Sequence, residues 1–342
     1  MRILIIKLGA MGDVLRTTPL LPALRKKYPG SKITWLVEAR CRGVLEKNPF
    51  IDTLCAYSQE PVSVLKKVSF DLSVNLDKEP EALGAMMAIP SKKRMGFGLS
   101  DGERLCALDS TSDYAYRLGI DDELKFRQNK KTYQEITFEQ LGLEFHQEEY
   151  IFSSDPKSKA RAKKYLEGAG FNSSRKTGMV IGLNTGAGRR FAGKRLPIST
   201  YLSLIEKFST KMKSQVLLLG GRDEVERNAE IARTAKFPVI NTGSHPIQEF
   251  AAIVRSCDLV ISGDTTALHI AIAVKVPVVT YFGSTCAQEI ELYGRGKKII
   301  SNMECAPCYK RVCPIHERCM KETDAEALFQ ASAEMLEGAA RC

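Results

Sequence analysis

The sequence of 342 residues lacks any apolar run close to the ~18 residues needed to cross a lipid bilayer. Residues 1–15 contain a short apolar core without a small-residue cleavage site after it, so we interpret them as a first strand and its turn rather than as a signal peptide. Internal repeats and low-complexity segments are also missing. We therefore expect a cytoplasmic, globular protein.

The chain has a single tryptophan and no RNA- or DNA-binding motif. Its formal net charge is +10, from 50 basic and 40 acidic residues, which fits an anionic partner such as a nucleotide, a phosphorylated lipid, a membrane surface or a nucleic acid. The basic residues are dispersed rather than gathered in blocks. We therefore expect no nucleic-acid partner.

The G-x-G-x-x-G fingerprint of dinucleotide folds is missing as well, so we do not predict NAD. The first buried strand, residues 3–8, leads instead into the turn Gly9-x-x-Gly12-Asp13 and a helix. Strand and helix patterns then alternate to residue 98 and again from residue 179. This alternation predicts an α/β fold of two tandem doubly wound, parallel sheets. Parallel sheets bind ligands at the carboxyl ends of their strands, so we expect both domains to face one cleft.

We expect a first domain at residues 1–153, a second at 154–322 and a closing amphipathic helix at 323–342. Residues 149–153 have a strand pattern, and residues 40–47 a helical one. Residues 99–130 are polar, break the alternation and are predicted to be a long irregular excursion. They form either an acceptor-binding region or a solvated surface loop.

Two loops at strand ends have the chemistry of a phosphate site. The loop Gly263–Thr266 offers backbone N–H groups and hydroxyls at a helix N-terminus, although Asp264 or Thr265 could simply cap that helix. The loop Asn184–Pro197 carries Arg189, Arg190, Lys194 and Arg195, which suit a diphosphate but could also form a solvated basic loop. No acidic pair with metal-ligand spacing accompanies it, so cations and helix N–H groups rather than Mg²⁺ are predicted to stabilise a diphosphate leaving group.

Four further side chains could serve chemistry or structure. Asp13 could accept a proton from an attacking hydroxyl or cap its helix, and the pattern slightly favours the cap. His269 could face the ligand or be a satisfied core histidine. Glu224 and Glu226 suit the dipole of their helix, and one of them could also hold a ribose hydroxyl.

Four of the ten cysteines lie close together, at Cys305, Cys308, Cys313 and Cys319. In a cytosolic protein such a cluster favours a metal site over disulfides, so structural Zn²⁺ or iron is possible here. Four ordinary free thiols are the alternative.

Several motifs together resemble the ADP-heptose:lipopolysaccharide heptosyltransferases of glycosyltransferase family 9. They are ILIIKLGAMGDVLRTTPLLPALRKKYP, GLNTGAG with GKRLP, LLLGGRDE and DLVISGDTTALHIAIAVKVPVVTYFGST. The segment CAPCYKRVCPIHERCM is most similar to the heptosyltransferase II branch. The resemblance covers nearly the whole chain and is weakest at residues 85–150.

The resemblance implies a GT-B fold with an N-terminal acceptor domain, a C-terminal nucleotide-sugar donor domain and a last helix packing back on the N-terminal domain. It implies inverting, metal-independent transfer of L-glycero-D-manno-heptose from ADP-heptose to the lipopolysaccharide inner core on lipid A, with transient contact at the inner face of the cytoplasmic membrane. It also reverses the preference at Asp13, which becomes the general base. The donor residues implied are Thr185, Lys194, Glu224, Asp264, Thr265, Thr266 and His269, with Thr266 standing where many members have glycine. The basic residues predicted to contact the acceptor are Lys7, Lys92, Lys93 and Arg94.

The residues also fit other functions. The chain could be a member of the same family with another sugar donor or a protein acceptor. It could also be a non-catalytic protein that binds a nucleotide sugar or a nucleic acid.

Overall fold

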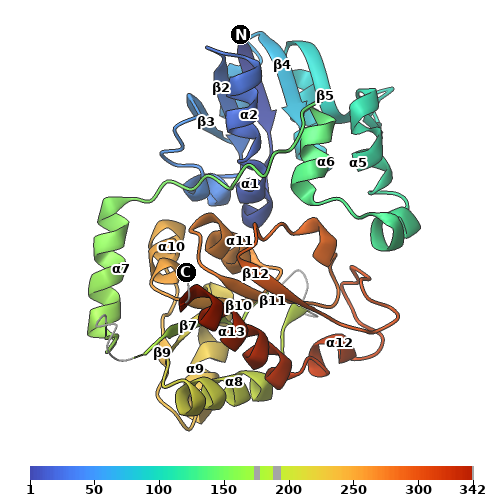
Figure 1. Ribbon diagram of the computed structural model, residues 1–342. Helices are drawn as coiled ribbons and strands as arrows, with labels where there is room; N and C mark the ends of the chain where they lie inside the picture. The colour runs from blue at the N-terminus through green and yellow to red at the C-terminus, as the bar shows by residue number, and fades with distance from the viewer. Residues whose placement is uncertain (173–177, 188–193, 341–342) are drawn as a thin grey trace. The chain divides into compact units, whose positions relative to one another are not determined.

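The computed structural model describes residues 1–172, 178–187 and 194–340, and the chain divides into two compact units. Unit 1 comprises Met1–Ser153 and Gln288–Glu291, and unit 2 comprises Ser154–Ala287 and Leu292–Cys342. Each unit contains one six-stranded sheet (Figure 1). The units divide after Ser153, where the first domain boundary was predicted, but the return of Gln288–Glu291 to unit 1 was not expected.

The sheet of unit 1 has the order β3-β2-β1-β4-β5-β6, and its first five strands are parallel. β6 is antiparallel to β5. Apolar residues of β1 and β4 are buried, as expected for central strands covered on both faces. The strands are β1 (Arg2–Ile6), β2 (Lys32–Val37), β3 (Thr53–Ala56), β4 (Phe70–Asn75), β5 (Ser91–Ser100) and β6 (Arg104–Ala107). The α-helices are α1 (Met11–Thr17), α2 (Leu20–Lys27), α3 (Gln59–Leu65), α4 (Pro80–Ala88), α5 (Asp113–Arg117) and α6 (Tyr133–Gln140).

Three predictions for unit 1 were wrong in detail. Residues 99–130 are not one irregular excursion, because they include the end of β5, β6, α5 and the π-helix η3 (Leu124–Gln128). Residues 149–153 are not a strand: the Ile151 N–H donates to the Thr18 hydroxyl at 2.8 Å instead of to a sheet neighbour. The helix expected from residue 40 is the short 3₁₀ helix η1 (Ala39–Val44).

The sheet of unit 2 has the order β12-β11-β10-β7-β8-β9, and its strands are all parallel. They are β7 (Val180–Asn184), β8 (Gln215–Leu219), β9 (Ile240–Asn241), β10 (Leu259–Gly263), β11 (Val278–Phe282) and β12 (Gly296–Ile300). The helices are α7 (Pro156–Gly168), α8 (Ile198–Lys211), α9 (Val225–Thr234), α10 (Ile247–Arg255), α11 (Thr266–Ala273), α12 (Arg318–Lys321) and α13 (Ala325–Ala340). The two α/β sheets, parallel except for β6, confirm the predicted fold class.

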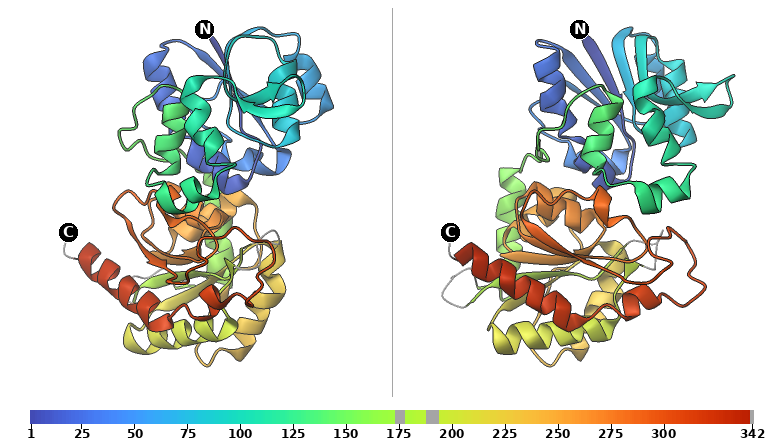
Figure 2. Two further views of the ribbon diagram at one scale, coloured as in Figure 1. Left: turned by 90° about the vertical axis from the view of Figure 1, so that its right-hand side faces the viewer. Right: turned by 45° about the vertical axis from the view of Figure 1, so that its right-hand side comes forward.

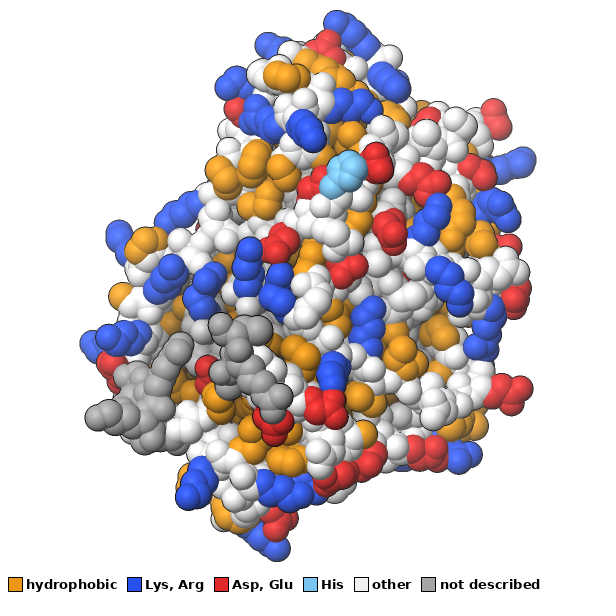
Figure 3. All heavy atoms as spheres, in the orientation of Figure 1, with side chains coloured by type: hydrophobic (Ala, Val, Ile, Leu, Met, Phe, Trp, Pro, Cys, Tyr) orange, Lys and Arg blue, Asp and Glu red, His pale blue; other side chains and the backbone are white. Residues whose placement is uncertain are grey.

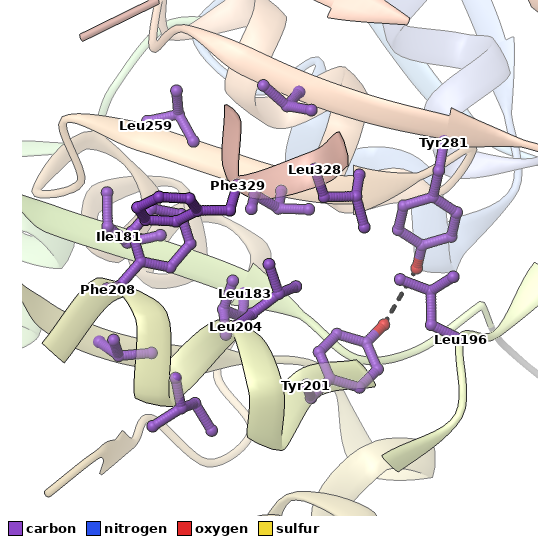
Figure 4. Packing of buried hydrophobic residues seen from close by; sticks show 14 of the residues in the cluster. Ile181, Leu183, Leu196, Tyr201, Leu204, Phe208, Leu259, Tyr281, Leu328 and Phe329 are labelled. Carbon is purple, nitrogen blue, oxygen red and sulfur yellow. Dashed lines mark hydrogen bonds between the residues drawn. The ribbon is translucent and has the colours of Figure 1, made fainter. Parts of the chain in front are cut away.

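The closing helix α13 belongs to unit 2. α13 lies beside α8 on one face of the unit 2 sheet (Figures 1 and 2). Its Leu328 and Phe329 are buried in the same core as Phe208 of α8 and Ile181 of β7 (Figure 4). The apolar stripe of α13 therefore completes the core of unit 2.

No helix in the described part of the chain has the length and hydrophobicity that a membrane crossing requires. On the face drawn in Figure 3, Lys and Arg side chains are interspersed with Asp and Glu side chains. This agrees with the dispersed basic residues of the sequence.

Candidate functional site

In both sheets the first strand of the chain lies at the centre, and the later strands are added first on one side of it and then on the other. In unit 1 the chain runs from β1 to β3 on one side and from β4 to β6 on the other. In unit 2 it runs from β7 to β9 and then from β10 to β12. The order therefore reverses between β1 and β4 and between β7 and β10. Doubly wound sheets bind ligands beyond the carboxyl ends of the strands at such reversal points.

In unit 2, Asn184 joins the two loops at the reversal point. It ends β7, is buried, and its Nδ2 donates to Ser262 Oγ and Thr265 Oγ1, both at 3.2 Å. Ser262 Oγ also lies 3.0 Å from Thr265 Oγ1. The hydroxyl of Thr265 is thus used between the loops and makes no capping bond to α11, so the structure does not support the cap interpretation for this residue. Sequence reasoning missed Asn184, although a polar residue ending an apolar strand was the available signal.

Two buried tyrosines contact the same strand ends from within the core of unit 2. The Tyr201 hydroxyl donates to the Asn184 carbonyl at 3.0 Å and lies 3.0 Å from the Tyr281 hydroxyl (Figure 4). A Cβ atom on Gly263 would come within 2.9 Å of the Tyr281 ring. Only glycine therefore lets the Asp264 loop pass this close to the core.

Lys194, Asp264 and His269 are brought together at the start of α11. Lys194 Nζ lies 3.0 Å from Asp264 Oδ2 and donates to the Asp264 carbonyl at 3.1 Å. His269 is 3% exposed, and its Nε2 lies 3.7 Å from Asp264 Oδ1. A cation, an acid and an imidazole therefore meet beside the N–H groups that open α11, as a site for a charged phosphate ligand requires.

Glu224 lies in a narrow space between two glycine turns. Its Oε2 accepts from the Gly221 N–H at 2.9 Å, and a Cβ atom on Gly186 would come within 2.0 Å of its Cδ. Its Oε1 is buried and has no hydrogen-bond partner among the residues that the structure describes, with Arg195 Nη2 3.9 Å away. Such an oxygen is suited to accept a hydrogen bond from a ligand hydroxyl.

The remaining predicted donor residues differ in access. Thr185 is fully buried, and its hydroxyl donates to Asn228 Oδ1 on α9, so its side chain is turned into the unit. Thr266 is the first residue of α11 and is partly exposed. Arg189 and Arg190 lie outside the described residues.

In unit 1, Asp13 follows β1 and lies in the first turn of α1. Its Oδ2 accepts from the Ala10 N–H at 3.3 Å, so it makes the helix-terminal contact that the cap interpretation predicts. Its Oδ1 lies 2.8 Å from Arg16 Nη2, and its side chain remains 35% exposed. The capping contact therefore leaves the carboxylate accessible.

Arg16 is itself fixed by α6. Its guanidinium lies 3.8 Å above the Tyr133 ring, and the Tyr133 hydroxyl lies 2.8 Å from Thr17 Oγ1. Burial lowers the pKa of Arg16, but the Asp13 carboxylate and other nearby groups raise it by more, so Arg16 stays charged. Sequence reasoning missed Arg16, whose signal was its position three residues after Asp13.

Lys7 is placed at the same strand end, but it is 5% exposed and paired with a carboxylate. Its Nζ lies 2.5 Å from Asp77 Oδ1, and Asp77 Oδ2 accepts from the Leu8 N–H at 2.5 Å. Burial lowers the pKa of Lys7, but Tyr133, Asp77 and Asp13 raise it by more. The pair therefore ties the β1 loop to the end of β4 and leaves Lys7 little access to a ligand.

The structure does not bring Lys92, Lys93 and Arg94 to Asp13. They lie in the first half of β5, where Lys93 is in register with Leu72, whereas the strand end beside Asp77 is reached at Asn75. Lys92 is exposed and pairs with Asp71 at 2.7 Å, and Arg94 donates to the carbonyls of Met86 and Ile89. Basic residues at the start of a strand belong to the sheet edge opposite the ligand edge.

The cysteine segment does not contain a preformed metal site. The four thiols are free, and among the described residues no group of three or more His, Cys, Asp or Glu side chains is placed to hold a metal ion. Burial raises the pKa of Cys319, and the neighbouring Cys313, Cys308 and Cys305 raise it further, so the thiols are neighbours. The structure therefore brings the four thiols near one another without placing three of them, among the described residues, to hold an ion.

Two Rossmann-like sheets, each with its functional side chains at the reversal point, define the GT-B class of glycosyltransferases. The family model of glycosyltransferase family 9 (heptosyltransferase) matches residues 63–318, well over half of the chain. The chain belongs to this family and is a glycosyltransferase, which confirms the family that the sequence motifs indicated.

Known proteins similar to this chain agree with that assignment. Lipopolysaccharide heptosyltransferase 1 of Campylobacter coli is 25% identical over 303 residues, which cover 83% of this chain and 84% of that protein. A glycosyltransferase family 9 structure from Veillonella parvula superposes with a TM-score of 0.75 at 19% identity, covering 98% and 97% of the two chains. The structure of E. coli ADP-heptose lps heptosyltransferase II superposes with a TM-score of 0.73 at 15% identity, covering 99% of each chain.

Proposed function

We propose that the protein transfers L-glycero-D-manno-heptose from ADP-heptose to the lipopolysaccharide inner core, with inversion, without a metal ion and with Asp13 as general base. The observation that carries this proposal is the set of side chains at the two reversal points. One offers an accessible carboxylate, and the other offers a cation, an acid, an imidazole and a buried carboxylate oxygen. Family membership and the names of the relatives support heptose as the sugar and lipopolysaccharide as the acceptor.

Unit 2 is the proposed donor unit. Lys194 and the N–H groups at the start of α11 bind the diphosphate, and Asp264 with His269 fixes Lys194 and the sugar beside it. The Oε1 oxygen of Glu224, which lacks a hydrogen-bond partner among the described residues, accepts a hydrogen bond from a ribose hydroxyl. Thr185, Thr265 and Thr266 shape the surrounding loops, and the larger Thr266 side chain narrows the pocket compared with glycine.

In the proposed reaction, the acceptor oxygen attacks the anomeric carbon while the bond from that carbon to the diphosphate oxygen breaks. Asp13 takes the hydroxyl proton, and ADP leaves with the bonding electron pair. A single displacement inverts the anomeric configuration. Lys194 and the helix N–H groups stabilise the charge on the leaving diphosphate, so the proposed step needs no metal ion.

We also propose that the enzyme works at the inner face of the cytoplasmic membrane, because its proposed acceptor is anchored in lipid. The net charge of +10 supports transient contact with an anionic surface.

The test is transfer from ADP-heptose to a panel of truncated lipopolysaccharide cores, with a chelator present and with Asp13→Asn alongside the wild type. We expect product despite the chelator and a loss of about 10²–10⁴-fold in kcat for Asp13→Asn, with ADP binding retained. The anomeric configuration of the product, read by NMR, tests inversion.

Other outcomes contradict separate parts of the proposal. Binding of ADP-heptose without transfer to any core would indicate another acceptor, such as a protein. Failure to bind ADP-heptose while a UDP-sugar binds would overturn the donor assignment. Unchanged transfer by Asp13→Asn would exclude Asp13 as the base.

A further inference from the structure

Lys78 stands at the reversal point of unit 1, one residue after the Lys7–Asp77 pair. β1 and β4 are parallel neighbours in which Ile6 is in register with Asn75, so Lys78 follows the same sheet edge as Asp13. Lys78 is partly buried, whereas Lys7 beside it is almost fully buried. Lys78 is therefore the more accessible cation at this strand end.

The ammonium group of Lys78 is held by neutral partners. Its Nζ donates to the Ala115 carbonyl at 2.8 Å and lies 4.6 Å from the centre of the Phe97 ring. A Cβ atom on Gly119 would come within 2.3 Å of Nζ, so the turn after α5 fits closely around the ammonium. Among the described residues, no carboxylate forms an ion pair with Lys78, in contrast to the Lys7–Asp77 pair next to it.

The electrostatic surroundings of Lys78 are short of negative charge. Its pKa is lowered to about 8, first by burial and then by Lys125; Glu289 opposes this lowering, and Lys7 adds to it. A partly buried ammonium whose charge is destabilised in this way is stabilised by an anion bound beside it. A purely structural lysine, which only caps α5 and covers Phe97, has no such requirement.

We propose that Lys78, assisted by Lys125, binds an anionic oxygen group of the acceptor, either a sugar carboxylate or a phosphate. The inference rests on the proposed function for the identity of the acceptor. It assigns to unit 1 a specific anion subsite on the sheet edge of Asp13, in place of the predicted Lys92, Lys93 and Arg94.

The test compares Lys78→Met, which keeps the side-chain stem over Phe97, with Lys78→Arg and with the control Lys32→Met. Lys32 is an exposed lysine at the start of β2, paired with Asp52 at 3.0 Å. We expect Lys78→Met to raise the acceptor KM by about 10- to 100-fold, as for the loss of a charge-assisted hydrogen bond, without changing the donor KM. Lys78→Arg restores part of the affinity, and Lys32→Met leaves both constants unchanged.

Two acceptor derivatives distinguish the source of the anion. One has its phosphates removed, and the other has its sugar carboxylate reduced to an alcohol. The derivative that lacks the group bound by Lys78 shows equal KM values for the wild type and Lys78→Met. The inference is overturned if Lys78→Met raises the KM of both derivatives as much as that of the native acceptor. It is also overturned if Lys78→Met changes no KM by more than Lys32→Met does.

A second measurement does not depend on transfer activity. In protein labelled with ¹³C at the lysine Cε, inorganic phosphate or acetate should move the titration midpoint of Lys78 to higher pH, because the anion stabilises the ammonium. Lys78→Met identifies the signal. A midpoint unmoved by either anion overturns the anion site even in an active enzyme, whereas a moved midpoint in a protein without heptose transfer supports the site and contradicts the proposed function.

Discussion

Asp13 combines a structural contact with an accessible carboxylate. One of its oxygens accepts a hydrogen bond from the Ala10 N–H, and the other pairs with Arg16. About a third of the side chain stays exposed. The cap and base interpretations of the sequence are therefore compatible. The sequence pattern did not reveal that the Tyr133 ring packs against Arg16, because Tyr133 belongs to a helix 120 positions after Asp13 in the chain.

Arg16→Met should lower kcat by about 10-fold or more, because Asp13 loses the cation that orients it, and imprecise placement of a catalytic group is costly. The ADP affinity of unit 2 should not change. Stopped assays at saturating substrates give kcat, and calorimetry gives the ADP affinity. Arg16→Lys, which keeps a charge but loses the fork geometry and the ring stacking, should be intermediate. A wild-type kcat in Arg16→Met would show that Asp13 needs no such support.

The acceptor affinity should fall as the pH rises through the pKa of Lys78, about 8. The ammonium is the form that binds an anion, so binding is complete below this pH and declines above it. The groups that set this pKa besides burial are Lys125, Glu289 and Lys7. Acceptor KM values measured on both sides of pH 8 provide the check. Lys78→Arg should remove this part of the dependence, because a guanidinium stays charged; an equal dependence in that variant would point to another group.

At the scale of elements, α13 should stabilise unit 2 strongly. Phe329 is 4% exposed, and its ring lies 5.2 Å from that of Phe208 on α8. Phe329→Ala should therefore reduce the free energy of unfolding by about 3–5 kcal/mol, measured by chemical denaturation. Glu337→Ala, at an exposed position of the same helix, should change it by less than about 0.5 kcal/mol. Equal effects of the two substitutions would mean that α13 is not part of the core.

Strand and helix patterns predicted which elements form better than they predicted which sheet edge carries each candidate site residue. The buried runs at β1, β4, β7 and β10 identified parallel strands, because such strands are apolar on both faces. The same patterns could not show that Lys92 and Lys93 lie within β5, near its start and therefore near the sheet edge opposite Asp13. The amphipathic stripe of α13 indicated a packed helix, but its partner depends on long-range contacts that no local pattern contains.

At the scale of the molecule, each unit has its own core and, in the proposal, its own ligand. ADP should therefore protect the amide hydrogens of β7, β10 and α11 from exchange and leave those of β1 and β4 unchanged. At a free concentration about 100 times its Kd, ADP should stabilise unit 2 by about 2.7 kcal/mol. Hydrogen-exchange mass spectrometry measures both effects. Protection confined to unit 1 would show that the proposal assigns the nucleotide to the wrong unit.

The return of Gln288–Glu291 to unit 1 limits how the two halves of such an enzyme can be exchanged during evolution. Gln288 Nε2 donates to the Lys125 carbonyl at 3.2 Å, and Glu289 acts electrostatically on both Arg16 and Lys78. A gene segment encoding only residues 1–153 would leave this acid behind in the other half. Recombination between relatives at that boundary would therefore combine unit 1 residues of one sequence with Glu289 of another, and the two halves must change together.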